Sequence, residues 1–205
     1  MALSRITNYI EADGADLNLQ SSDTTITASS VLGVINFKAP SEASGTDAIL
    51  LASKIEAVAE GTFSASSNAT ELVFFTASSE AAGTAGGGKM VMSSTGNLTL
   101  KDTRTTDGSS PTITLQTGDT DIAQDDVLGT INFQAPDEGT GTDAILVAAG
   151  IAAVSEGDFS SSSNATKLSF KTGASETAAE KMSLGSGGDL SIVTDGASIF
   201  FGADS

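Results

Sequence analysis

The sequence predicts an all-β protein made of two tandem β-rich repeats, and three features of the chain carry that prediction. Apolar residues mostly alternate with polar or small residues, which is the period of two typical of half-buried strands. Segments rich in Gly and Ser separate these stretches and provide turns. One unit of sequence also occurs twice in the 205 residues.

The duplication sets the predicted domain organisation. Residues 31–76 align without a gap on residues 127–172, and most of the aligned positions are identical. Beyond residue 76 the copies differ by a gap within the Gly- and Ala-rich stretch 77–88 and then rejoin. The predicted organisation is an N-terminal segment (1–13), a first repeat of roughly 90 residues (14–101), a linker (102–107), a second repeat (108–194), and a remainder (195–205) that resembles the start of a further unit.

The strands of a repeat are predicted from pairs of apolar residues two positions apart. In the first repeat these pairs are Leu17/Leu19, Ile35/Phe37, Leu72/Phe74, Met90/Met92 and Leu98/Leu100. Short turns at 93–96 and 185–188 are predicted to be hairpin tips. We expect Ile35, Phe37, Ile55, Leu72 and Phe74, with their counterparts in the second repeat, to hold the core, so that Phe37→Ala and Phe133→Ala would each cost ~3 to 5 kcal/mol if these rings are buried.

The segment 48–60 is open to two interpretations. It is rich in Ala and Leu, with Asp47 placed as an N-cap and Gly61 where a helix would end. The second copy has Gly150 in mid-segment, which would cost a helix ~1 kcal/mol. We favour a strand and keep a helix as the alternative.

The charge and composition exclude several classes of function. Twenty-six acidic residues against nine basic ones give a net charge of -17, which repels phosphate backbones and anionic lipids. The chain has no Cys and no His, so it can form neither a Cys/His zinc site nor a catalytic triad. The longest apolar run, residues 144–154, is too short to span a membrane, which takes ~20 residues. We predict no nucleic acid partner and no membrane insertion.

An ordered set of short motifs occurs in both copies. In the first copy it consists of Gly33-x-Ile-x-Phe37, Ile55-x-Ala-Val-x-Glu-Gly61, Leu72-x-Phe-x-Thr76, Lys89-Met90 and Gly96-Asn-Leu98. In the second copy it falls on Gly129, Ile131, Phe133, Ile151, Ala153, Val154, Glu156, Gly157, Leu168, Phe170, Thr172, Lys181, Met182 and Gly188. This pattern resembles the repeat of phage tail fibre proteins, which are common in marine phages and often end in a self-cleaving intramolecular chaperone domain.

Two departures from the family pattern stand out. The family commonly has Glu-Arg-Met-Arg-Ile where this chain has Gly88-Lys-Met-Val-Met92 and Glu180-Lys-Met-Ser-Leu184, so a charged cross-strand partner is absent. No chaperone domain follows in this sequence, from which we expect a fragment of a longer fibre or a short structural component.

The resemblance implies an elongated, fibre-like homotrimer that acts as a shaft-like structural segment of the virion. It implies other tail proteins and a host surface glycan as further partners, synthesis in the host cytoplasm, and no catalysis and no cofactor. The composition fits this independently, because a chain with nine Phe, one Tyr and no Trp has a thin core, and short strands leave edges that invite association.

Carboxylates provide the only candidates for chemistry. Asp119, Asp121, Asp125 and Asp126 form an acidic cluster, but their spacing does not fit an EF-hand loop and we expect a solvated turn without metal. The acids repeated in both copies, which could act in a glycosidase, are Glu42/Glu138, Asp47/Asp143 and Glu60/Glu156. We predict no catalytic, metal or cofactor residues. The alternatives are a carbohydrate-binding module that uses the loop 62–68 and, third, a glycan depolymerase.

Overall fold

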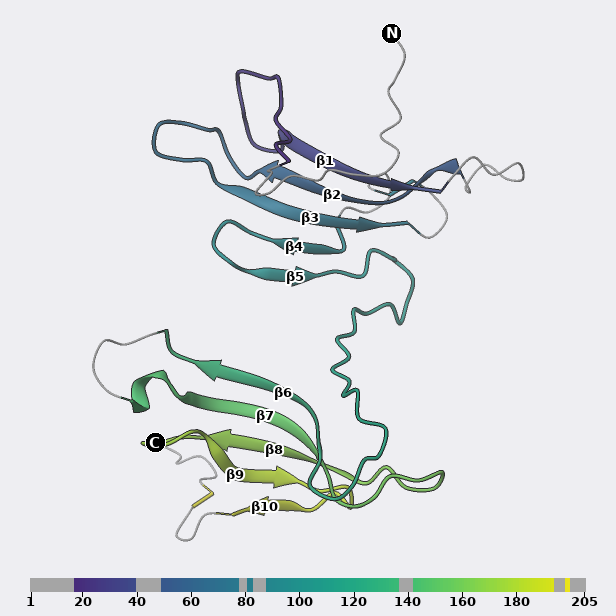
Figure 1. Ribbon diagram of the computed structural model, residues 1–205, viewed down its shortest axis with the longest axis vertical. Coiled ribbons are helices and arrows are strands. Elements are labelled where there is room, and N and C mark those ends of the chain that lie inside the picture. Colours follow the sequence, from purple (N-terminus) through teal and green to yellow (C-terminus); the bar gives the residue numbers. More distant parts are fainter. Residues whose placement is uncertain are drawn as a thin grey trace. The chain divides into compact units, whose positions relative to one another are not determined.

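The computed structural model describes residues 17–39, 49–77, 81–82, 88–136, 142–193 and 198–199. The chain forms two compact units, Met1–Thr112 (unit 1) and Ile113–Ser205 (unit 2). Each unit holds one five-stranded antiparallel sheet (Figure 1), and no α-helix occurs among the described residues. The prediction of an all-β fold from a duplicated unit is confirmed.

Unit 1 is a meander in which each strand pairs with the next along the chain. Its strands are β1 (Val31–Lys38), β2 (Leu51–Ala59), β3 (Thr70–Thr76), β4 (Met90–Met92) and β5 (Leu98–Leu100), in that spatial order. All four pairings are antiparallel. The outer strands β1 and β5 pair on one side only among the described strands, so the sheet has two edges.

Unit 2 repeats this meander with the same order of strands. Its elements are β6 (Val127–Gln134), the short 3₁₀ helix η2 (Asp143–Ile145), β7 (Val147–Ser155), β8 (Thr166–Thr172), β9 (Ala179–Leu184) and β10 (Leu190–Ile192). The register shifts at the two ends of the β6 and β7 pairing occur at the same places as in the β1 and β2 pairing. The sequence duplication is therefore a duplication of strand register as well.

The ambiguous segment 48–60 is a strand over most of its described part, since β2 spans Leu51–Ala59 and pairs with β1 on one side and β3 on the other. Helix propensity is a weak preference that tertiary pairing overrides, and β2 gains two ladders of backbone hydrogen bonds as the second strand of the sheet. The strand interpretation is confirmed.

Both predicted hairpin tips are turns. The chain turns between β4 and β5 at 93–96, where the Gly96 N–H donates to the Ser93 carbonyl, and between β9 and β10 at 185–188. Gly96 and Gly188 end these turns with φ of 82° and 87°, a left-handed conformation that strains any residue with a Cβ. The glycines found at these positions in both copies meet this backbone requirement.

The predicted core residues share one face of the sheet, but the prediction that they are buried was wrong. The register places Ile35, Ile55 and Phe74 in one row across β1, β2 and β3. Phe37 nevertheless remains 49% exposed and its counterpart Phe133 remains 55% exposed, while Ile55 and Phe74 are half-buried. The large apolar side chains lie on a face that no other described segment fully covers.

The buried core of unit 1 lies on the other side of the sheet. Val73 and Phe75 of β3 are buried against Ala82, from the connection between β3 and β4. Gly88, near the end of this connection, lies against the same cluster, since a Cβ there would lie 2.2 Å from Cγ1 of Val73. The connection is longer in the first copy, and Ala82, one of its described residues, packs in this cluster.

The corresponding side of unit 2 is built from small residues. Ala152 and Val154 of β7 are buried there with Ser169 of β8 and Ser183 of β9. The Lys167 ammonium and the Glu180 carboxylate pair across this side at 3.0 Å. Unit 2 therefore covers this side with long charged side chains.

Candidate functional site

The feature that distinguishes both units is a continuous apolar side of the sheet, which we call the apolar face. Side chains at alternate strand positions point to the same side, so the register defines its members. In unit 1 its apolar members are Gly33, Ile35, Phe37, Ile55, Ala57, Leu72, Phe74, Met90, Met92, Leu98 and Leu100, and the register also places Ser53 and Thr76 on this side. In unit 2 they are Gly129, Ile131, Phe133, Ile151, Ala153, Leu168, Phe170, Met182, Leu184, Leu190 and Ile192.

The apolar face is open to solvent within each unit. On unit 1 Leu72 is 40% exposed, whereas its neighbour Val73, which points to the other side of β3, is 4% exposed. Met92 and Leu98 of the short hairpin are also exposed. Contiguous apolar surface of this kind marks interaction sites, whereas single exposed apolar residues do not.

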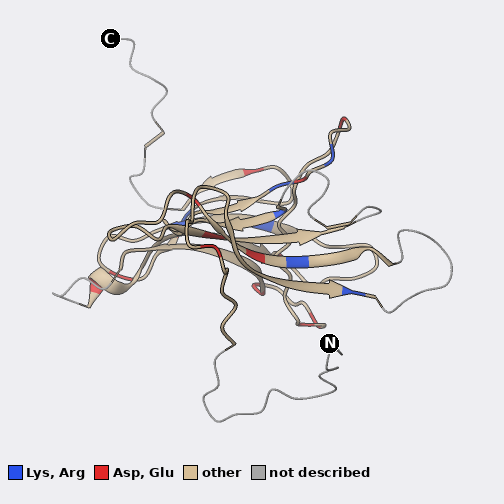
Figure 2. Cartoon of the chain, turned by 90° about the horizontal axis from the view of Figure 1, so that it is seen from above, with Lys and Arg blue, Asp and Glu red and all other residues tan. Residues whose placement is uncertain are grey.

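The apolar face carries no charged residue at its strand positions, and the charged strand residues lie on the other side, which we call the opposite face. There Lys54 forms an ion pair with Glu56 and places its ammonium 4.4 Å from the centre of the Phe75 ring. Figure 2 shows the charged residues as short blue and red stretches along largely tan strands. A partner of the apolar face must therefore be apolar as well, because an uncharged surface gives a charged partner no compensation for lost hydration.

The segment before each sheet partly covers its apolar face. Leu19 lies over Gly33 in unit 1, and Leu115 lies over Gly129 in unit 2. A small apolar hollow remains beside Leu19, lined by Ile35, Ile55 and Leu72 among others. Leu19 itself stays 45% exposed, so this segment covers part of the apolar face and leaves the rest open to solvent.

Glu60 and Glu156, candidates for acid/base chemistry, instead fasten hairpin tips. The Glu60 carboxylate accepts hydrogen bonds from the backbone N–H of Ser94, at 2.9 Å, and from its hydroxyl. Glu156 accepts the backbone N–H of Ser186 at 3.0 Å. These hydrogen bonds from Ser94 and Ser186 lower the pKa of both carboxyl groups below their ordinary value. A general acid needs the opposite shift, so the geometry favours a structural role.

The acidic cluster at 119–126 consists of turn residues. The Asp119 carboxylate accepts the N–H of Asp121 at 3.0 Å, and the Asp126 carboxylate accepts the N–H of Ala123 at 2.7 Å. Asp125 adopts a positive φ of 71°, as Asp often does in turns. No group of three or more acidic residues that could hold a metal ion occurs among the residues that the structure describes.

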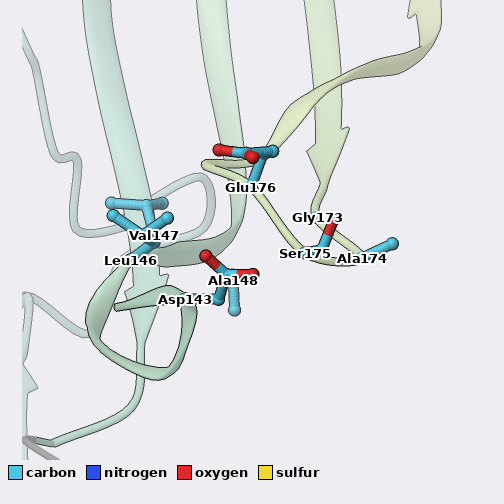
Figure 3. A pocket seen from close by; sticks show the side chains of 8 residues that line it. All are labelled: Asp143, Leu146, Val147, Ala148, Gly173, Ala174, Ser175 and Glu176. Atoms are coloured by element: carbon cyan, nitrogen blue, oxygen red, sulfur yellow. The ribbon is translucent and has the colours of Figure 1, made fainter. Parts of the chain in front are cut away.

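Two other carboxylates line one pocket in unit 2. Figure 3 shows Asp143, from η2, and Glu176, from the loop after β8, lining it with Gly173 and Ser175. The pocket measures about 90 Å³, whereas sites for small-molecule ligands usually measure ~300 to 1,000 Å³.

The loop 62–68, which the carbohydrate-binding alternative uses, is a tight Ser-rich turn. Ser64 and Ser67 pair across it through their backbones, and the side chain of Thr70 donates to the carbonyl of Asn68 at 2.9 Å. Unit 2 repeats this turn with Ser160, Ser163 and Thr166. The Ser64 hydroxyl contacts Ser66 within the loop, and the aromatic residue of the loop, Phe63, is half-buried.

Several predicted features lie outside the described residues. They are Glu42, Asp47, Glu138, the N-terminal segment 1–13 and most of the remainder 195–205. No helix among the described residues has the length and apolarity to cross a membrane.

Comparison with known proteins gives a likeness in fold only. No protein-family model matches the chain, and no curated protein matches it. The chain is similar to the carboxy-terminal domain of the bacteriophage T5 L-shaped tail fibre, with 12% identity, 97% of this chain and 92% of that chain covered, and a TM-score of 0.37. It is also similar to that domain with its intramolecular chaperone domain, with 12% identity, 95% and 63% covered, and a TM-score of 0.39.

Both solved structures are parts of a phage tail fibre, the class of protein that the repeat pattern resembles. At this distance the likeness assigns neither an activity nor a partner to the chain. The residues of the apolar face carry the functional reasoning instead.

Sequence reasoning identified the side chains of the apolar face but not their exposure. The period of two places Ile35 and Phe37 on one side of a strand, yet it cannot say which side of a sheet a connection will cover. The signal that could have settled this is the buried pair Val73 and Phe75, which alternates with Leu72 and Phe74 within β3. A strand that is apolar on both sides needs two covers, and one chain provides only one.

Proposed function

We propose that the chain is a non-enzymatic structural component of a phage virion, a shaft-like segment of a tail fibre that assembles as a homotrimer. The single observation that carries this proposal is the exposed apolar face found on both sheets. The number of three chains follows from the resemblance of the repeat to tail fibre proteins.

Self-association would bury the apolar face that a single chain leaves exposed. Burial of apolar surface contributes ~25 cal/mol per Å², so an apolar face left in water forgoes most of the stabilisation that its side chains could provide. Three copies around one axis would turn three such faces toward each other and pool them into one core. Repeats stacked along the axis would contact mainly their neighbours, which suits a shaft.

The absence of chemistry in the proposal rests on what the repeated acids do. The Glu60 and Glu156 carboxylates accept hydrogen bonds from hairpin turns, which lower their pKa values. The remaining partners in the proposal, other tail proteins and a host surface glycan, follow from the resemblance alone. Synthesis in the host cytoplasm follows from it too.

Sedimentation equilibrium of the purified chain tests this proposal. The expected mass is three times the 20.4 kDa of one chain, over a wide range of concentration. Incubation with bacterial polysaccharide should release no reducing ends. A chain that sediments as a single copy, or that cleaves polysaccharide, would contradict the proposal.

A further inference from the structure

The two units of one chain present nearly the same apolar face. Position by position, the apolar members named above are identical in both units except at two places, where Met92 corresponds to Leu184 and Leu100 corresponds to Ile192. Beside Phe37 and Phe133 on the same side, Ser53 of unit 1 corresponds to Ala149 of unit 2. Both exchanges nearly conserve volume, and such exchanges are the ones that packed apolar surfaces tolerate best.

The backbone beneath the apolar face is also the same in both units. Gly33 and Gly129 each receive the leucine of the preceding segment, with Cβ to Cβ approaches of 2.8 Å and 2.7 Å for a Cβ built on the glycine. Ile35 and Ile131 have similar exposed fractions, 42% and 50%. A surface that fits the apolar face of one unit therefore meets the same contour on the other.

Much of the opposite face differs between the units. Lys54, Glu56 and Phe75 of unit 1 correspond to Gly150, Ala152 and Lys171 of unit 2. The side chains of the two copies thus differ in charge and size on this side, whereas those of the apolar face are nearly the same. Packing within the unit does not fully account for this, because several side chains of the apolar face, such as Phe37 and Leu72, remain exposed there.

From this equivalence we infer that the apolar face does not distinguish unit 1 from unit 2, so that unit 1 of one copy associates with unit 2 of another as readily as with unit 1. The inference rests on the proposed self-association and names its partner surface, the apolar face of either unit in a second copy of this chain. A partner with a charged or polar surface is disfavoured, because the apolar face has no charged strand position in either unit.

A mixing experiment with full-length chains tests this inference. Ile35→Glu blocks the apolar face of unit 1, and Ile131→Glu blocks that of unit 2. Both positions are exposed in the single chain, so the sheet can accept the charge. An apolar contact between two copies cannot accept it, because the charge would lose its hydration there. Asn36→Glu and Asn132→Glu are the matched controls, because these neighbouring residues are also exposed but point to the opposite face.

The two blocked variants, carrying different affinity tags, are unfolded together and refolded as a mixture. Each one retains a single open apolar face, on unit 2 in the first and on unit 1 in the second. If the faces are interchangeable, pull-down on one tag should recover the other variant about as efficiently as the control pair recovers each other. Far-UV circular dichroism checks that both variants fold, and Phe37→Lys with Phe133→Lys provides a second pair should either fail.

The composition of the recovered oligomers shows whether the two units are interchangeable. Recovery of mixed oligomers at the level of the controls supports the inference. If each variant associates only with itself, or if neither associates while the wild-type chain does, the units are not interchangeable and the inference fails, although the proposed fibre role survives. If the wild-type chain is itself monomeric, the proposed function fails as well.

Discussion

Leu19 lies directly over Gly33, close enough that a Cβ on the glycine would come within 2.8 Å of the leucine Cβ. The same relationship joins Leu115 and Gly129 in unit 2, at 2.7 Å. These two contacts fix the segment that precedes each sheet against the apolar face. They therefore determine how much of that face remains open for another chain.

Gly33→Val should destabilise unit 1 by about 1 to 3 kcal/mol, because the added side chain overlaps Leu19 and forces the preceding segment away. Gly129→Val should act in the same way on unit 2. Urea denaturation measures the change in the free energy of unfolding. Gly61→Val is the matched control, since no atom lies within 4 Å of a Cβ there, and a loss as large in the control as in Gly33→Val would refute the role of this contact.

Phe75→Ala and Phe37→Ala should differ in kind. Phe75 is buried within its own unit, so its removal should cost about 3 kcal/mol at any protein concentration. Phe37 is half-exposed in the single chain, so its removal should mainly weaken association, and the measured stability should depend on concentration. Thermal unfolding at two widely separated concentrations distinguishes these effects, and a concentration-independent loss for Phe37→Ala would count against the assembly role of the apolar face.

Glu60 should make the attachment of the hairpin tip depend on pH. Its folded-state pKa lies below the ordinary value of 4.5 because of the hydrogen bonds from Ser94, so it contributes stability above pH 4.5 that is lost as the pH falls through the lowered folded-state pKa. Glu60→Gln should remove this acid-dependent part. Amide hydrogen exchange at Ser94, followed as a function of pH, provides the measurement.

Asp158→Asn serves as the control for this experiment. Asp158 is an exposed acidic residue of unit 2, two positions after Glu156, which is the counterpart of Glu60. This substitution should leave the pH profile of the Ser94 amide unchanged. A profile that is equally steep in Glu60→Gln and in the wild-type chain would show that another group fastens the hairpin.

The segment between the sheets contains a testable ion pair. Arg104 binds the Asp102 carboxylate through its side chain and its backbone N–H, which lowers the pKa of Asp102 from 3.8 to about 2. Arg104→Gln should return this pKa toward its ordinary value. Titration of the Asp102 carboxyl carbon by NMR measures the change, and a pKa that stays near 2 in the variant would mean that other contacts hold the carboxylate.

The sequence allowed most strands and turns to be predicted because their signals are local. The strand predicted at Leu17/Leu19 was wrong, because that segment has no regular structure and Leu19 packs over Gly33. Alternation placed Ile35 and Phe37 on one face, and the glycine in the turn at 93–96 marked a hairpin tip. The helix-like composition of β2 did not mislead, because the Gly150 of the second copy weighed against a helix. Local signals could not predict which side of the sheet would be covered, since that depends on where residues of the connection after β3, such as Ala82, pack.

The roles of the repeated acids were also beyond the sequence. Glu60 and Ser94 are far apart in the chain, and only the meander of strands brings the carboxylate to the hairpin tip. Repetition of Glu60 as Glu156 indicated a shared role without saying whether it was chemical or structural. The hydrogen bonds of the two carboxylates favour the structural role.

Light scattering on a size-exclusion column, applied to the wild-type chain and to the double variant Leu72→Asp/Leu168→Asp, shows whether the apolar faces hold copies of the chain together. We expect a trimer for the wild-type chain and a folded monomer for the variant, in which a charge stands on the apolar face of each unit. A wild-type chain that elutes as a stable monomer, or a double variant that remains a trimer, would contradict this expectation.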